Sequence, residues 1–84
     1  MKARRLLKRI ATAQRNVRFS DALTLAQALG FRLARTEGSH HILIHPAVRE
    51  PLNLQNVRGQ AKPYQVKQLV QLVERYNLQL DEEI

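Results

Sequence analysis

The sequence has no cysteine and no tryptophan, and its aromatic residues are two tyrosines and two phenylalanines. Without cysteine, neither a disulfide framework nor a cysteine-ligated zinc site can stabilise the fold. No apolar run approaches the roughly 20 residues that a membrane-spanning helix needs. The N-terminal stretch that begins at Lys2 is interrupted by Lys8 and Arg9, so we predict no signal peptide. We therefore expect a soluble, cytoplasmic protein with no membrane partner.

Acidic residues are scarce, and their distribution is uneven. The 84 residues contain 14 Lys and Arg against seven Asp and Glu, which gives a net charge of +7. Residues 1–18 hold basic side chains and no acidic ones, whereas residues 81–83 are all acidic. This balance favours a polyanionic partner, because neutralised phosphates release condensed counterions. Anionic membranes, acidic proteins or a merely solvated basic face are also compatible with it.

Two helices are predicted in the first third of the chain. Residues 2–14 form an amphipathic helix, because apolar residues recur at helical spacing while basic residues face away. A second helix covers residues 21–29. Ser20 is expected to cap its first turn, Asp21 to favour its positive end and Gly30 to end it.

Alternating apolar and polar residues then predict a small sheet. Residues 32–36 form one strand, Glu37 and Gly38 a turn, and residues 39–45 a second strand ended by Pro46. Residues 51–55 form a weaker third strand. Short connections favour an antiparallel meander.

The last part of the chain predicts a polar loop over residues 56–62 and a final helix over 63–77, with Pro63 at its first position. The order is therefore α-α-β-β-β-α. It predicts one α+β domain, residues 1–84, in which helices pack on one face of a three-stranded antiparallel sheet. An acidic tail, residues 78–84, follows.

All three histidines lie in residues 37–46, whose sequence is Glu-Gly-Ser-His-His-Ile-Leu-Ile-His-Pro. On a strand, His41 and His45 point to one side but lie roughly 13 Å apart, at about 3.3 Å per residue. His40 points to the other side. Because a zinc ion needs nitrogen ligands about 2 Å away, the three cannot share a metal. We expect no metal site and no cofactor.

A single histidine is nevertheless sufficient for acid–base chemistry, because its ordinary pKa lies near neutral pH. When a ribose 2′-hydroxyl attacks the adjacent phosphate, one proton must be removed and another delivered, and no metal is required. The Gly38-Ser39 pair before His40 lets a phosphate approach and adds a hydroxyl donor. Composition alone also allows a surface or turn histidine here.

The chain from the second helix onward resembles the HicA toxin family. The resemblance rests on Gly30-Phe31 followed by a strand, then Gly38-Ser39-His40-His41-Ile42, then His45-Pro46, and it covers about residues 19–77. It leaves residues 1–18 as an additional basic helix. It implies a fold similar to the double-stranded-RNA-binding domain (dsRBD-like) and the activity of a type II toxin–antitoxin toxin, a ribosome-independent mRNA endonuclease restrained by a HicB-type antitoxin.

By this resemblance the essential histidine corresponds to His40, with the adjacent His41 as the fallback. Ser39 would hydrogen-bond the phosphate. The RNA would be positioned through backbone contacts, which give affinity and little sequence choice, by three basic residues: Arg35, Arg58 and Lys62.

The sequence also departs from the family pattern in two places. Many members carry a Pro-x-His segment on the third strand and a Lys-Gly-Thr entry to the last helix. Here residues 51–55 are Pro-Leu-Asn-Leu-Gln, and residues 59–63 are Gly-Gln-Ala-Lys-Pro. The alternative hypothesis is therefore a non-catalytic RNA- or DNA-binding module of the same fold. In a third hypothesis, the basic helix of residues 1–18 docks an acidic partner such as the antitoxin.

Overall fold

The computed structural model describes residues 2–80 and shows an α+β architecture. Its elements, in chain order, are α1 (Lys2–Thr12), α2 (Phe19–Ala28), β1 (Arg32–Glu37), β2 (His40–His45), β3 (Val48–Val57), β4 (Gln60–Ala61) and α3 (Pro63–Tyr76). The strands form one antiparallel sheet in the order β1-β2-β3-β4. None of the described helices is long and apolar enough to cross a membrane.

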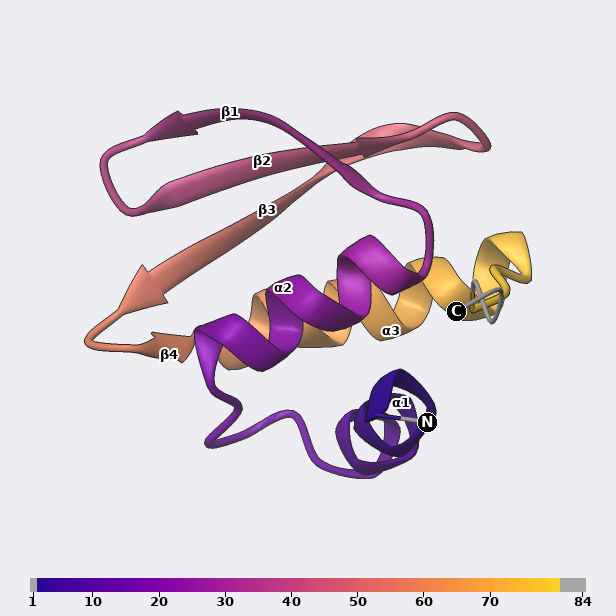
Figure 1. Ribbon diagram of the computed structural model, residues 1–84, viewed down its shortest axis with the longest axis horizontal. Coiled ribbons are helices and arrows are strands. Elements are labelled where there is room, and N and C mark those ends of the chain that lie inside the picture. The colour runs from indigo at the N-terminus through magenta and orange to yellow at the C-terminus, as the bar shows by residue number, and fades with distance from the viewer. Residues whose placement is uncertain (1, 81–84) are drawn as a thin grey trace.

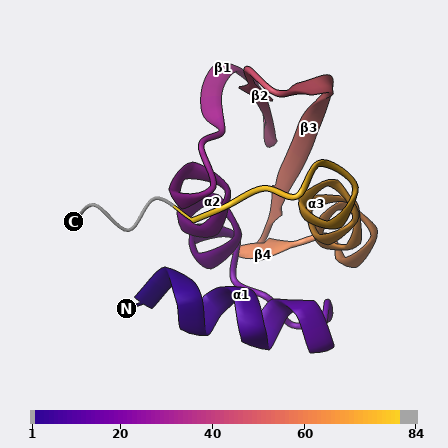
Figure 2. The same ribbon diagram turned by 90° about the vertical axis from the view of Figure 1, so that its right-hand side faces the viewer.

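The elements are stacked in three layers (Figures 1 and 2). The helices α2 and α3 cover one face of the sheet, and α1 lies on their far side. The prediction of helices on one face of a small sheet is therefore confirmed. Among the described residues, no helix covers the other face of the sheet, which we call the open face.

The core fills the space between the sheet and the two helices. Residues of β2, β3, α2 and α3 are completely inaccessible to solvent there, including Leu43, Leu52, Leu54, Leu25 and Leu69. Burying each such side chain contributes about 1.5–3 kcal/mol relative to exposure. The strand residues of this set face the helices, so their neighbours in sequence face outward.

The helix α1 adds the third layer through a narrow apolar stripe. Ala3, Leu6 and Ile10 are buried against the rest of the molecule, while the basic residues between them are exposed. The helix ends at Thr12, two residues earlier than predicted. The Gln14 side-chain amide donates to the Ile10 carbonyl at 2.7 Å, which satisfies one of the carbonyls that the helix end leaves free.

The predicted start of α2 is wrong. The helix begins at Phe19, and Arg18 occupies the N-cap position without a side-chain cap. Ser20 therefore lies inside the first turn and does not cap it. Burial of the Phe19 ring and the hydrogen bond from its N–H to the Gly59 carbonyl, 2.9 Å, set the start through tertiary contact.

The predicted end of α2 is confirmed. Gly30 has a φ of +103°, its N–H donates to the Gln27 carbonyl, and the Phe31 N–H donates to the Ala26 carbonyl. These two bonds form a Schellman motif, which a glycine at the positive-φ position favours. The chain leaves the motif directly into β1.

The predictions of a three-stranded sheet and of a loop over residues 56–62 are wrong. The strand β3 extends to Val57, turns at Arg58 and Gly59, and returns as β4. Both turn residues have positive φ, +55° and +86°, as a two-residue hairpin turn requires. The Asn56 side-chain oxygen accepts the Gly59 N–H at 2.8 Å. Arginine in place of the usual Asn or Asp concealed this hairpin in the sequence.

Smaller differences concern other boundaries. The first hairpin turns at Gly38 and Ser39 rather than at residues 37–38, and α3 ends at Tyr76. Within the predicted tail, Leu78 is buried in the core. Its acidic residues, 81–83, lie outside the described part of the chain.

Candidate functional site

His40 lies at the start of β2, on the open face of the sheet. The strand registers place it opposite Glu37 of β1 and Gln55 of β3. Leu43, three residues after His40 on the same strand, is completely buried on the helix side. Because side chains alternate along a strand, His40 faces away from the helices and is accessible to a ligand on the open face.

A hydrogen bond holds the His40 ring from the sheet side. Its Nδ1 lies 3.1 Å from Nδ2 and 3.3 Å from Oδ1 of Asn53 on β3. The ring is half-buried. Within residues 2–80, Nε2 has no hydrogen-bond partner, so this nitrogen is the one that can exchange a proton with a bound molecule.

His41 occupies the opposite side of the same strand. Its ring packs against Phe19 at the start of α2, with the ring centroids 4.5 Å apart. Its Nδ1 donates to the Ser39 carbonyl at 3.1 Å. The two adjacent histidines therefore face different surroundings, and His40 alone of the two lies on the open face.

His45 ties the end of β2 to the end of α2. Its Nε2 donates to the Leu29 carbonyl at 3.0 Å, and its Nδ1 accepts the Ala47 N–H at 3.0 Å. A methyl group on Gly30 would lie 2.7 Å from Nε2, so the ring fills the space that this glycine leaves. Both ring nitrogens are occupied, which gives His45 a structural role.

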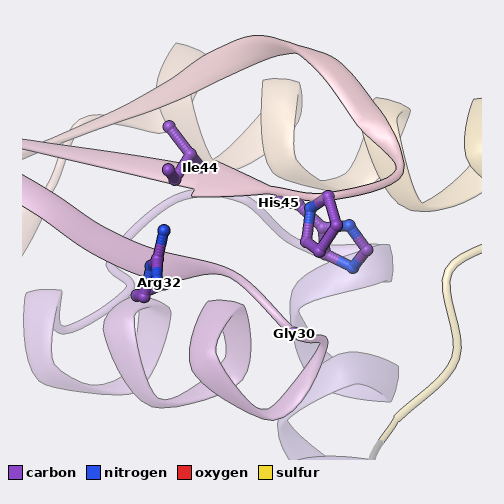
Figure 3. A pocket seen from close by; sticks show the side chains of 5 residues that line it. Gly30, Arg32, Ile44 and His45 are labelled. Atoms are coloured by element: carbon purple, nitrogen blue, oxygen red, sulfur yellow. The ribbon is translucent and has the colours of Figure 1, made fainter.

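A cleft of about 310 Å³ opens beside His45 (Figure 3). It is lined by Gly30, Arg32, Ile44, His45 and Pro46. Ile44 lies four residues from His40 on β2, roughly 13 Å at about 3.3 Å per residue. This cleft therefore lies at the other end of the strand from the candidate histidine.

Two of the other predicted site residues lie near His40. Arg35 is on the same face, because it pairs with Ile42 in the β1–β2 register, and it forms an exposed ion pair with Glu37 at 3.0 Å. Ser39 lies in the turn before His40. Its carbonyl accepts the Asn56 N–H at 2.9 Å, which fastens the turn to β3.

The two remaining predicted residues lie farther along the sheet. Arg58 is exposed in the β3–β4 turn, at the same end of the sheet as the β1–β2 turn. Lys62 occupies the N-cap position of α3, beyond β4, and its Nζ lies 5.9 Å from the centre of the Tyr64 ring. The β3–β4 hairpin that carries Arg58 is hydrogen-bonded to the start of α2, through the bond from the Phe19 N–H to the Gly59 carbonyl.

The segments that surround His40 coincide with a known family. The family model of the HicA toxin of bacterial toxin-antitoxin systems matches residues 19–74, from the start of α2 almost to the end of α3. This chain belongs to the HicA toxin family. No curated protein and no solved structure matches it. The resemblance seen in the sequence is thereby confirmed, and the HicA chain is a toxin of a toxin–antitoxin pair.

The helix α1 of this HicA chain lies outside the matched region and on the far side of the molecule from His40 (Figure 2). Lys2, Arg5 and Lys8 are exposed on it. Arg9 instead pairs with Asp21 of α2 at 2.9 Å. The layer of α2 and α3 separates these charges from the open face, so α1 forms a second basic surface.

Two open-face residues of the HicA chain escaped the sequence analysis. Asn53 contacts the His40 ring, and Arg32 pairs with Ile44 on the same face. The alternation of Leu52, Asn53 and Leu54 could have placed Asn53 opposite the core. Within residues 2–80, no three His, Asp or Glu side chains are close enough together to hold a metal ion.

Proposed function

We propose that this HicA protein is a metal-independent mRNA endonuclease in which His40 is the general acid or base. One observation supports the proposal most directly. In the family's Gly-Ser-His segment, the His40 ring is held at Nδ1 on an uncovered sheet face, and its Nε2 has no partner within the described residues.

The reaction needs proton transfers that an imidazole at this position can perform. The ribose 2′-oxygen loses its proton and attacks the neighbouring phosphorus, and the bond from phosphorus to the 5′-oxygen breaks. The 5′-oxygen takes up a proton, which leaves a cyclic phosphate on one product. His40 would remove the first proton or supply the second. Such a group contributes typically 10²–10⁴-fold to the rate.

Basic and polar residues near this end of the sheet suit a phosphate backbone. Arg35 lies on the open face of β1, Ser39 directly precedes His40, Arg58 lies in the β3–β4 turn at the same end of the sheet, and Lys62 is the N-cap of α3. Contacts of this kind fix the position of an RNA strand and provide little sequence information. We therefore assign single-stranded mRNA as substrate and these four residues to its binding.

Regulation follows from the family. A toxin that cleaves mRNA in the cytoplasm must be restrained, and we propose a HicB-type antitoxin as the partner. An RNA cleavage assay with added antitoxin tests this partner. The cleavage rate must fall in proportion to the amount of toxin–antitoxin complex that forms.

The central experiment compares cleavage of RNA by the parent protein, His40→Ala and His41→Ala, all in chelator. We expect His40→Ala to lose about 10²–10⁴-fold in rate and the parent to cleave without added metal. His41→Ala is the matched control, since it removes the same ring from the other side of β2. Full cleavage by both variants would refute the histidine mechanism, and loss in His41→Ala alone would transfer the role to His41.

The second candidate function is a non-catalytic RNA- or DNA-binding module. The amide at Asn53, where many family members have a histidine, favours it. Such a module would bind RNA with an affinity that falls steeply with salt and would form no new RNA ends. The same assay therefore separates the two functions.

A further inference from the structure

Asn53 occupies the centre of β3 with its side chain on the open face. Its neighbours Leu52 and Leu54 are completely buried on the helix side. The register pairs His40 with Gln55, so Asn53 is the diagonal neighbour of His40, 13 residues along the chain. Such diagonal neighbours are within reach of long or ring-bearing side chains.

Both ends of the Asn53 amide lie within hydrogen-bond distance of one ring atom. Nδ2 is 3.1 Å and Oδ1 is 3.3 Å from His40 Nδ1. The amide can thus donate a hydrogen to a bare Nδ1, or accept the hydrogen of a protonated Nδ1. Either bond fixes the ring in one orientation and leaves Nε2 for a substrate.

We propose that Asn53 is a positioning residue that keeps the His40 imidazole bonded in both of its protonation states. General acid–base catalysis moves a histidine through both states in each turnover. Because the proton is exchanged at Nε2, Nδ1 keeps its hydrogen in both states, and Asn53 Oδ1 can accept that hydrogen throughout. The kinetic part of this inference rests on the proposed nuclease function, whereas the contact itself does not.

The neutrality of the amide is part of the proposal. A carboxylate beside an imidazole would favour the charged ring, because opposite charges attract. On this face, within residues 2–80, the charged side chains nearest His40 along the sheet are Glu37 and Arg35 of β1, which are paired with each other at 3.0 Å. From β3, the neighbours are the uncharged amides of Asn53 and Gln55. The helices lie on the other side of the sheet.

The test uses Asn53→Asp, which keeps the shape and adds a charge, and Asn53→Leu, which keeps the volume and removes the bond. Gln55→Leu is the matched control, since it removes an amide from the same face of β3. The titration midpoint of the His40 ring is followed by NMR in each full-length protein, and RNA cleavage is measured against pH.

We expect Asn53→Asp to move the midpoint of His40 to higher pH by about one unit, and to move the pH profile of cleavage with it. We expect Asn53→Leu to lower kcat by about 10–100-fold, the scale known for partners that orient metal-bound histidines, with KM unchanged. Gln55→Leu should alter neither quantity.

An unchanged midpoint in Asn53→Asp would overturn the inference, and so would parental kcat and pH profile in Asn53→Leu. Thermal unfolding shows whether either variant has lost the fold. If Asn53→Leu does not fold, the near-isosteric Asn53→Asp is used alone to test the inference. If the parent cleaves no RNA while the midpoint still moves, the nuclease proposal fails and the Asn53–His40 bond stands. If the parent cleaves RNA and the midpoint does not move, the nuclease proposal stands and the Asn53–His40 inference fails.

Discussion

Replacing Gly30 with alanine tests whether the family's Gly-Phe and His-Pro segments act as one structural unit. The added methyl group would lie 2.7 Å from Nε2 of His45 and 3.1 Å from its Cδ2. Real side-chain contacts do not reach the shorter distance, so the ring must move. The His45 ring would then lose its hydrogen bond to the Leu29 carbonyl, now 3.0 Å long.

The expected magnitude has two parts. Alanine at the φ of +103° is strained by about 1–3 kcal/mol. Displacing His45 leaves a half-buried donor unpaired, which costs about 1–3 kcal/mol more. We therefore expect Gly30→Ala to lower the free energy of unfolding by roughly 2–6 kcal/mol, the sum of those two ranges.

Gly59→Ala is the matched control. Gly59 also has a positive φ, +86°, but nothing lies within 4 Å of the position of its missing methyl group. It should therefore show the backbone strain alone, so the two variants should differ by about 1–3 kcal/mol. Urea unfolding at neutral pH measures both.

A second variant isolates the ring. In a His45→Ala background the added methyl group meets no imidazole, so Gly30→Ala should cost no more than Gly59→Ala. The double-mutant coupling should then be about 1–3 kcal/mol. If Gly30→Ala and Gly59→Ala are equally destabilising in the parent, the reasoning about His45 is refuted.

Three further predictions concern acid stability, α1 and RNA binding. The pKa of Glu50 is lowered from its ordinary 4.5, first by the hydrogen bond from the Tyr76 hydroxyl at 2.7 Å. The stabilisation from this bond is fully present above the ordinary pKa of Glu50 and is lost as the pH falls through the lowered pKa of the folded state. Tyr76→Phe lacks the bond, so its free energy of unfolding should fall less than that of the parent between about pH 6 and pH 3. An equally steep loss in urea unfolding would contradict this. Ile10 is fully buried, so Ile10→Ala should cost about 2–5 kcal/mol while the exposed Arg5→Ala changes stability by less than about 0.5 kcal/mol; equal thermal shifts would show that α1 is not docked. Arg35→Gln should reduce the salt dependence of binding to a short RNA by about 0.7 in log–log slope, and Arg5→Ala should leave it unchanged, because α1 lies across the molecule; the opposite result would place the RNA on α1.

Much of the fold could be predicted because its signals are local. The spacing of apolar residues located all three helices, and alternation located the first two strands. Gly30 marked the end of α2 because glycine adopts positive φ readily, so this signal depends on a single residue. The family resemblance located the histidine segment, since its motif is continuous in sequence.

The hairpin of β3 and β4 could not be predicted in the same way. Its turn begins with Arg58, a residue type that does not favour positive φ. The returning strand is only two residues long, too short to show alternation, and it is held by contacts such as that from the Ala61 N–H to the Val17 carbonyl, 2.9 Å. The start of α2 was missed because the same hairpin sets it.

By itself, the sequence determined the helices, the core-facing pattern of the strands and the presence of His40 in a basic domain. Only the tertiary structure decided what each histidine touches. His40 meets Asn53 from 13 residues away, and His45 meets Leu29 from 16 residues away. The strand register fixes the first contact, and the packing of β2 against the end of α2 fixes the second. A shift of one residue in the register would turn His40 into the core side, and no local pattern specifies that alignment.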